Sequence, residues 1–207
     1  MASSIALELP RQNVTVVGAF NPAILQPGWV KRFVPAVEDE IHGLLPVQGG
    51  PTIFQAGPLY WIATDERLVV HGPIVQAARV ASTIVRTLSH TPLRAAGINF
   101  LFQGKADRAR CGPWRVSIAP AQPREAFGGA PEEFALSQVF RRDDGIRLTI
   151  KIVWPSEEPD ALLDLNYHRE GQAPLGEERA KELGDHMDLA GQREVEADRI
   201  RTELLNG

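Results

Sequence analysis

One helix-to-strand unit dominates the pattern of hydrophobic and polar positions along the chain. Pro73 suits the first turn of a helix, and Pro92 ends the helical region because the residue before a proline is pushed out of it. Leu93–Phe102 then alternates as a strand does. The pattern predicts an amphipathic helix of about five turns lying on a sheet. Its apolar face consists of residues three and four positions apart: Ile74, Ala77, Ala78, Ala81, Ile84, Val85 and Leu88.

The stretch before this unit predicts further strands and one helix. Asn13–Phe20 is rich in β-formers, and Trp29–Leu45 has apolar residues at helical spacing. Pro35 requires this helix either to begin near that residue or to be kinked there. Thr52–Ala63 and Arg67–His71 are predicted to be strands joined by a polar turn. Residues 1–103 therefore predict a ferredoxin-like βαββαβ half, with two helices on one face of an antiparallel sheet.

The second half begins after an irregular connection. Residues 104–131 are rich in glycine and proline and predict a long loop between the halves, with one short strand at Trp114–Ala119. Phe134–Arg142 and Ile146–Trp154 flank Asp143-Asp144-Gly145, and an Asp-Gly turn between alternating runs is a strong hairpin signal.

The rest of the chain predicts one more strand and a C-terminal helix. Ala161–Glu170 alternates apolar and polar residues, and Glu177–Leu205 carries an apolar stripe interrupted by Gly184 and Gly191. Residues 132–207 are thus expected to form an antiparallel meander closed by a helix. The overall fold class is α+β, and the two halves are expected to pack together, with sheets that can join into one.

Composition limits the environment and the general chemistry of the protein. The chain has 207 residues, of which 43% are hydrophobic, which is ample for a buried core. A single cysteine excludes an internal disulfide and favours a reducing compartment. No apolar run approaches the about 18 residues of a membrane span, and the first residues do not have the pattern of a signal peptide. We expect a cytoplasmic protein without a membrane partner.

The charge is distributed unevenly. The net charge is -4, and from Glu177 onward nine acidic residues stand against five basic ones, whereas the preceding 176 residues hold 17 of each. A balanced body exerts no general attraction on a phosphate backbone, so nonspecific nucleic-acid binding is not favoured.

The known short motifs of catalysis and cofactor binding do not occur. There is no zinc spacing, nucleophile elbow, Walker loop or dinucleotide fingerprint in the sequence, so we expect no metal and no cofactor. The histidines are scattered along the chain: His42, His71, His90, His168 and His186.

Two histidines on predicted strands are the best catalytic candidates. His71 ends one strand, and His168 shares a strand face with Asp164, so folding could bring them together. The alternative interpretation, ordinary surface or hydrogen-bonded side chains, carries more weight because no further motif accompanies them.

A basic loop holds the remaining candidates. Cys111 is surrounded by cations that would favour its thiolate, which makes it a candidate reactive thiol. The same cations, with Trp114 and the nearby Arg141-Arg142, are candidates for contact with nucleic-acid phosphates. The alternative is an inert cysteine in a solvated loop. The cations of this loop are Lys105, Arg108, Arg110 and Arg115.

Three segments carry a resemblance to a known family. The strand AAGINFLFQ, the hairpin strand LTIKIVW and the segment LLDLNYHRE before an acidic C-terminal helix are similar to a sporadically distributed bacterial family of hypothetical proteins with no assigned activity. The resemblance implies a two-part α+β fold and supplies no catalytic residue.

The absence of a site motif, together with a large antiparallel sheet, predicts a noncatalytic binding protein. Strand edges pair readily with another chain, so we expect a protein partner and a homodimer formed through an exposed strand edge or the C-terminal helix. The alternative hypothesis is a nucleic-acid-contacting protein or a small hydrolase that uses the loop at residues 105–115 with His71 or His168.

Overall fold

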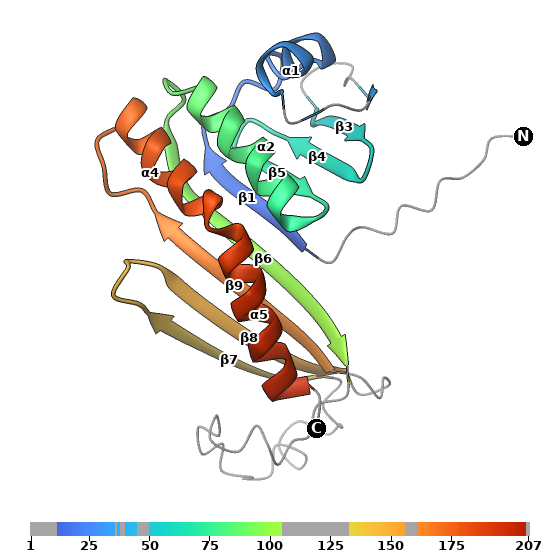
Figure 1. Cartoon of the computed structure of the whole chain (residues 1–207), viewed down its shortest axis with the longest axis vertical. Helices are drawn as coiled ribbons and strands as arrows, with labels where there is room; N and C mark the ends of the chain where they lie inside the picture. The colour runs from blue at the N-terminus through green and yellow to red at the C-terminus, as the bar shows by residue number, and fades with distance from the viewer. Residues whose placement is uncertain are drawn as a thin grey trace, which may run out of the picture.

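The computed structural model describes residues 12–35, 37, 40–44, 50–104, 133–155 and 161–205. In these residues nine strands form one sheet, with helices packed on it (Figure 1). The strands are β1 (Gln12–Gly18), β2 (Ile41–Leu44), β3 (Thr52–Ala56), β4 (Leu59–Ala63), β5 (Arg67–His71), β6 (Leu93–Gly104), β7 (Glu133–Arg141), β8 (Arg147–Pro155) and β9 (Ala161–Glu170). The helices are α1 (Pro27–Phe33), α2 (Ile74–Thr87), α4 (Glu177–Asp188) and α5 (Ala190–Leu205).

The strand order is β2-β3-β4-β5-β1-β6-β9-β8-β7, and all neighbouring strands are antiparallel. The expected α+β class with an antiparallel sheet is therefore confirmed. The first and second halves of the chain share this one sheet, because β6 pairs with β1 on one side and with β9 on the other.

The finer expectation of a ferredoxin-like first half is not shown by this topology. The segment predicted as a helix, Trp29–Leu45, contains the end of α1 and the strand β2 instead. Pro35 explains the early end of α1, since the residue before a proline disfavours the helical region and Val34 has φ -120° and ψ 74°. The single strand expected at Thr52–Ala63 is split into β3 and β4 by a turn at Gly57, where φ is +53°.

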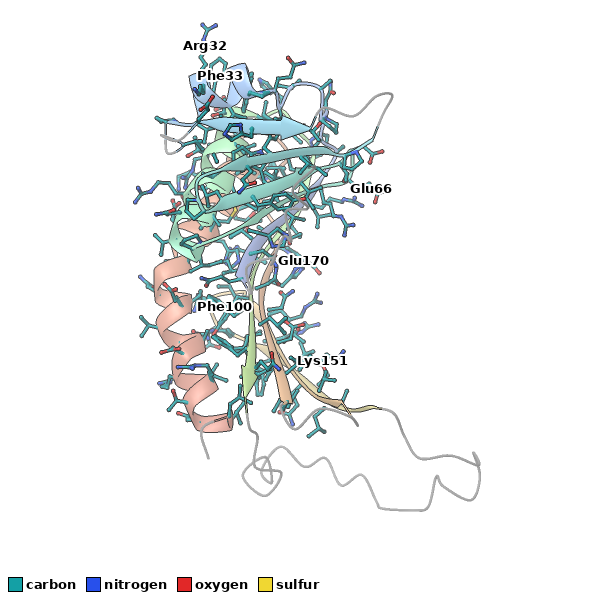
Figure 2. All side chains as sticks on the ribbon, turned by 90° about the vertical axis from the view of Figure 1, so that its right-hand side faces the viewer. Arg32, Phe33, Glu66, Phe100, Lys151 and Glu170 are labelled. Carbon is teal, nitrogen blue, oxygen red and sulfur yellow. The ribbon has the colours of Figure 1, made fainter. Side chains whose placement is uncertain are left out.

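Helices α2, α4 and α5 cover one face of the sheet, which we call the helix face (Figures 1 and 2). Alternate residues of β1, β6 and β9 point to this face and are buried, among them Val14, Ile98 and Leu165. Figure 2 shows Phe100 on the side of α5, and Lys151 and Glu170 on the opposite side. The sheet is therefore dry on the helix face, and its polar side chains gather on the other.

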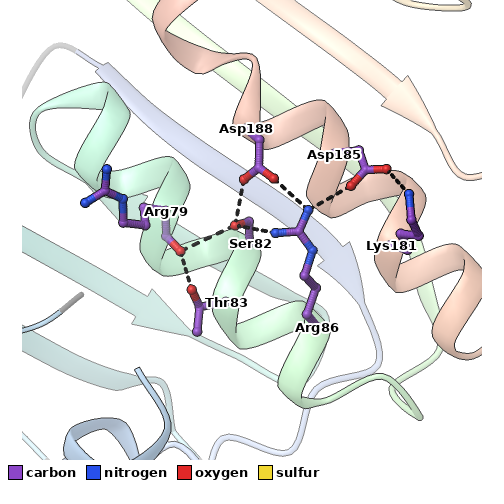
Figure 3. A network of polar contacts seen from close by, with 7 residues as sticks. All are labelled: Arg79, Ser82, Thr83, Arg86, Lys181, Asp185 and Asp188. Carbon is purple, nitrogen blue, oxygen red and sulfur yellow. Dashed lines mark hydrogen bonds and ion pairs between the residues drawn. The ribbon is translucent and has the colours of Figure 1, made fainter. Parts of the chain in front are cut away.

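A polar network fixes α2 against α4 (Figure 3). Arg86 Nη2 donates to Asp185 Oδ1 at 2.9 Å and to Asp188 Oδ2 at 2.6 Å, and Ser82 Oγ donates to Asp188 Oδ1 at 3.0 Å. A Cβ added at Gly184 would lie 2.6 Å from Nε of Arg86. Glycine at this position, which weakens an isolated helix, thus lets the Arg86 side chain cross α4 closely.

The predicted hairpin and the last strand agree with the structure. Strands β7 and β8 pair over nine residues, and Gly145 of the connecting turn has φ +79°, a value that glycine adopts readily. Strand β9 has the predicted bounds. The C-terminal segment is two helices that meet at Leu189, and its last turn is packed on the sheet, with Leu204 and Leu205 buried.

Ion pairs attach α5 to the β7–β8 turn. Arg193 is 6% exposed, and its guanidinium donates to Asp144 Oδ2 at 2.9 Å and to Glu196 Oε2 at 3.2 Å. Arg142 forms an ion pair with Glu196 as well. Asp144, which the sequence predicts to lie in the hairpin turn, therefore also binds Arg193 of α5.

We expect Tyr167→Phe to leave the free energy of unfolding unchanged or to raise it by up to about 1 kcal/mol, because it removes an unpaired buried polar group. Tyr167 is fully buried, and its hydroxyl has no hydrogen-bond partner among the described residues. The ring, which lies 5.5 Å from the guanidinium carbon of Arg193, is kept. Urea unfolding measures the change. A loss of more than about 1 kcal/mol would show that the hydroxyl contributes to the fold.

In the part of the chain that the structure describes, helices capable of crossing a membrane are absent, since none combines the necessary length and apolarity.

Candidate functional site

The sheet face opposite the helix face, here called the open face, carries a continuous row of polar residues. Cross-strand register places one residue from each of eight neighbouring strands in this polar row, and all of them are exposed or half-buried. In strand order they are His42, Gln55, Tyr60, His71, Asn13, Asn99, Asn166 and Thr149. Side-chain alternation along each strand accounts for the row, because the other face of the same strands is committed to the core.

Asparagines form the centre of the polar row. Asn99 Nδ2 donates to Asn13 Oδ1 at 2.8 Å, and Thr15 Oγ1 donates to the same oxygen at 3.0 Å. Asn166 Oδ1 is buried and has no hydrogen-bond partner among the described residues. A shallow hollow of about 230 Å³ beside these amides is lined by Asn13, Asn99, Phe100, Leu101 and Asp164. The residues that line this hollow offer hydrogen-bonding groups, but they do not include a nucleophile in contact with a base.

The predicted catalytic candidates lie on the open face but apart from one another. His71 is on β5 and His168 on β9, with β1 and β6 between them. Three strand spacings and two residues along the strand separate them by roughly 15 Å. Asp164 is four residues from His168 on β9, about 13 Å along the strand, and stands opposite Lys151. The fold thus places these groups on one surface without forming a dyad.

Burial shifts the pKa values of two of these groups, Asp164 and His168. The pKa of Asp164 is raised by burial, an effect that Lys151 partly opposes. The pKa of His168 is lowered by burial and by Arg147, while Glu170 acts in the opposite direction. His168 is therefore mainly neutral at pH 7 and can both donate and accept a hydrogen bond.

The basic-loop candidates lie outside the described residues: Cys111, Lys105, Arg108, Arg110 and Arg115. Their predicted roles remain predictions. Within the described ranges, the His, Cys, Asp and Glu side chains do not form a group of three or more that could hold a metal ion.

The free edge of β7 is a feature that residue motifs did not indicate. Within the described residues, β7 pairs with β8 alone and so ends the sheet. Its side chains include Val139, 57% exposed, and Phe140, 39% exposed. The alternating pattern predicted the strand, but its position at the edge depends on the order of all nine strands, which no local signal specifies.

The chain matches no protein-family model and no curated protein sequence. The resemblance to a bacterial family of hypothetical proteins stays a prediction, and a function for the chain is inferred from its geometry alone.

Proposed function

We propose that this protein is a noncatalytic binding protein that associates through the free edge of β7, and that a second copy of the chain occupies this edge. The observation that carries the proposal is a nine-residue edge strand with exposed Val139 and Phe140. Such an edge presents unpaired N–H and C=O groups that can pair with another strand.

The hairpin turn specifies which groups of β7 point outward. Arg142 N donates to Ile146 O at 2.9 Å, so these residues form a hydrogen-bonded pair. Hydrogen-bonded and non-hydrogen-bonded pairs alternate in an antiparallel ladder, so the N–H groups of Phe140 and Gln138 point to β8. Those of Ser137 and Val139 point away from β8, to the side on which none of the described strands pairs with β7.

The strand suits a copy of itself. In the antiparallel register that pairs the whole strand, Ser137 lies on the two-fold axis and Ala135 stands opposite Val139 of the second copy. In this register the outward-pointing residues of both copies face each other, as hydrogen bonding requires. Val139, which is more exposed than Phe140, would then pack against the small apolar side chain of Ala135 across the interface.

Other surfaces suit association less well. The opposite edge, β2, has four residues, and short edge strands pair poorly. On α5 the apolar side chains Ala197, Leu204 and Leu205 are buried in the core, and Val195 is the exposed large hydrophobic residue of that described helix. Strand β7 contains neither proline nor lysine, and its register with β8 has no shift. It therefore lacks the proline, the lysine and the bulge that protect many edge strands.

Ser137→Pro is expected to weaken the dimer about ten- to hundredfold, because each copy loses one outward hydrogen bond at the axis, worth about 0.5–1.5 kcal/mol. Proline is tolerated where the N–H faces away from the sheet, so the fold should persist. Light scattering coupled to size exclusion over a range of protein concentrations measures the mass.

Ser137→Ala is the matched control, because it keeps the N–H and should dimerise as the original protein does. A circular dichroism spectrum and a urea midpoint close to those of the original protein would show that Ser137→Pro is folded. A monomeric original protein at every concentration, or an unchanged dimer of Ser137→Pro, would refute the β7 interface.

A further inference from the structure

A basic hollow lies on the open face beside the β7–β8 turn, where β7 ends, β8 begins and β9 ends. It has a volume of about 260 Å³, and its polar lining includes Arg141, Arg147, His168, Glu170 and Gln172. We call these five residues the cationic corner. They come from three adjacent strands and the segment that follows β9, so the sheet itself holds them together.

Two arginines of the cationic corner stand directly opposite each other. Arg141 pairs in register with Arg147, and Arg147 with His168. The neighbouring pair Arg142–Ile146 is hydrogen-bonded, so Arg141 and Arg147 occupy a non-hydrogen-bonded position, where side chains of adjacent strands come closest. Like charges opposite each other in a sheet are destabilising. An arrangement of this kind needs a compensating negative charge.

The described carboxylates compensate only part of this charge. One Glu170 oxygen lies 3.8 Å from Arg147 Nη1 and 3.9 Å from His168 Nε2, and Glu170 is 63% exposed. No described carboxylate forms an ion pair with Arg141. Of the two guanidinium groups, that of Arg147 has one loosely held carboxylate partner, and that of Arg141 has none among the described residues.

The other arginines near the turn do not contribute to this excess, because acids on the helix face neutralise them. Arg142 and Arg193 share Asp144 and Glu196, and Arg169 bonds to Glu182. The unbalanced positive charge is thus confined to the open face, beside a hollow large enough for a small anion.

We propose that the cationic corner binds a phosphate group, with Arg141 and Arg147 as its charged ligands and His168 and Gln172 as hydrogen-bonding groups. Two arginine side chains on facing strands can each present a planar pair of N–H donors to phosphate oxygens. The phosphate can belong to a small phosphate ester or to a nucleic-acid backbone, and the experiment distinguishes these two sources.

The primary test is titration with inorganic phosphate at low ionic strength, followed by the NMR signals of the His168 ring. We expect saturable shifts and a Kd on the order of millimolar, with the His168 pKa higher when phosphate is bound, because an anion favours the protonated ring. Arg147→Gln and Arg141→Gln should each weaken binding by about tenfold or more.

Arg67→Gln is the matched control, since Arg67 is exposed on the same face but lies on β5, outside the cationic corner. It should leave the phosphate affinity within about twofold of the original value. Absence of a saturable His168 shift would overturn the proposal. Equal weakening by Arg67→Gln and Arg147→Gln would also overturn it, because binding would then reflect general attraction.

Two further ligands identify the source of the phosphate. Glycerol phosphate binding at least as well as inorganic phosphate, with no gain for a ten-nucleotide thymidine strand, supports a small ester. Binding of the oligonucleotide about a hundredfold tighter, lost in Arg147→Gln and kept in Arg67→Gln, supports a nucleic-acid backbone. Arg147 lies on β8, so its substitution should not change the mass measured for the β7 dimer. The two proposals can therefore fail separately.

Discussion

Lowering the pH from 7 to 4 is expected to remove about 3 kcal/mol from the free energy of unfolding through His186. His186 is 3% exposed, and its Nε2 lies 3.1 Å from the backbone oxygen of Tyr167. Because that oxygen only accepts, Nε2 carries the proton. The buried Nδ1, which has no hydrogen-bond partner among the described residues, must take up the second proton.

The sign follows from the two pKa values of this histidine. Burial lowers the pKa of His186 to about 4, and Arg193, Arg169 and His168 act in the same direction against the hydrogen bond to Tyr167. In the unfolded chain the pKa is about 6.5, so between pH 6.5 and pH 4 the unfolded state binds more protons. Stability is therefore complete above about pH 6.5 and falls as the pH drops towards 4.

Urea unfolding at several pH values between 7 and 4 measures this dependence. His186→Gln is the control variant, since an amide can still donate to the Tyr167 oxygen but does not titrate. We expect the variant to be less stable at pH 7 and to have a much flatter pH profile. His168, whose pKa is also lowered, adds a smaller change of the same sign. An equally steep profile in His186→Gln would contradict the assignment.

Gly72→Ala is expected to lower the free energy of unfolding by about 3 kcal/mol, through backbone strain and a steric clash. Gly72 connects β5 to α2 and has φ +136°, where residues with a Cβ are strained. A Cβ there would lie 2.9 Å from the backbone oxygen of Pro58 and 2.8 Å from Leu59 Cδ2. The leucine can move, but the backbone oxygen cannot without shifting the β3–β4 turn.

Gly28→Ala is expected to have the opposite effect on the free energy of unfolding, and urea unfolding measures both variants. Gly28 lies in α1, and a Cβ added there meets nothing within 4 Å. Alanine at this helical position should therefore raise the free energy of unfolding by up to about 1 kcal/mol. If Gly72→Ala lowers the free energy of unfolding by less than about 1 kcal/mol, the β5–α2 connection relaxes more easily than its geometry indicates.

Local patterns predicted several elements well because those elements follow from nearby residues. The α2 stripe and the β6 alternation specify one buried face each, and the Asp143-Asp144-Gly145 turn specifies its hairpin. Trp29–Leu45 was wrong as a single helix because helical spacing of apolar residues continued past Pro35, whose effect on Val34 ends α1. Val34 and Val37 of this pattern are buried, but they lie outside the helix.

The candidate site could be predicted only in part. The sheet face to which a side chain points follows from its position along its own strand, but the order of the strands depends on the whole chain. Alternation correctly placed Asp164 and His168 on one face of β9. That β1 and β6 separate His71 from His168, and that Arg147 faces His168, depends on pairing between distant segments. No short motif records such pairing, so the cationic corner and the β7 edge emerge only from the assembled sheet.

Strand β1 lies between β5 and β6, although it precedes both by about fifty residues or more. During synthesis this first described strand therefore has neither of its two described neighbours until much later segments leave the ribosome. Closing such long loops slows folding, since their entropy is lost before the contacts form. A nascent chain arrested before β6 would hold β1 with one side bare, so aggregation remains a risk until β6 has emerged.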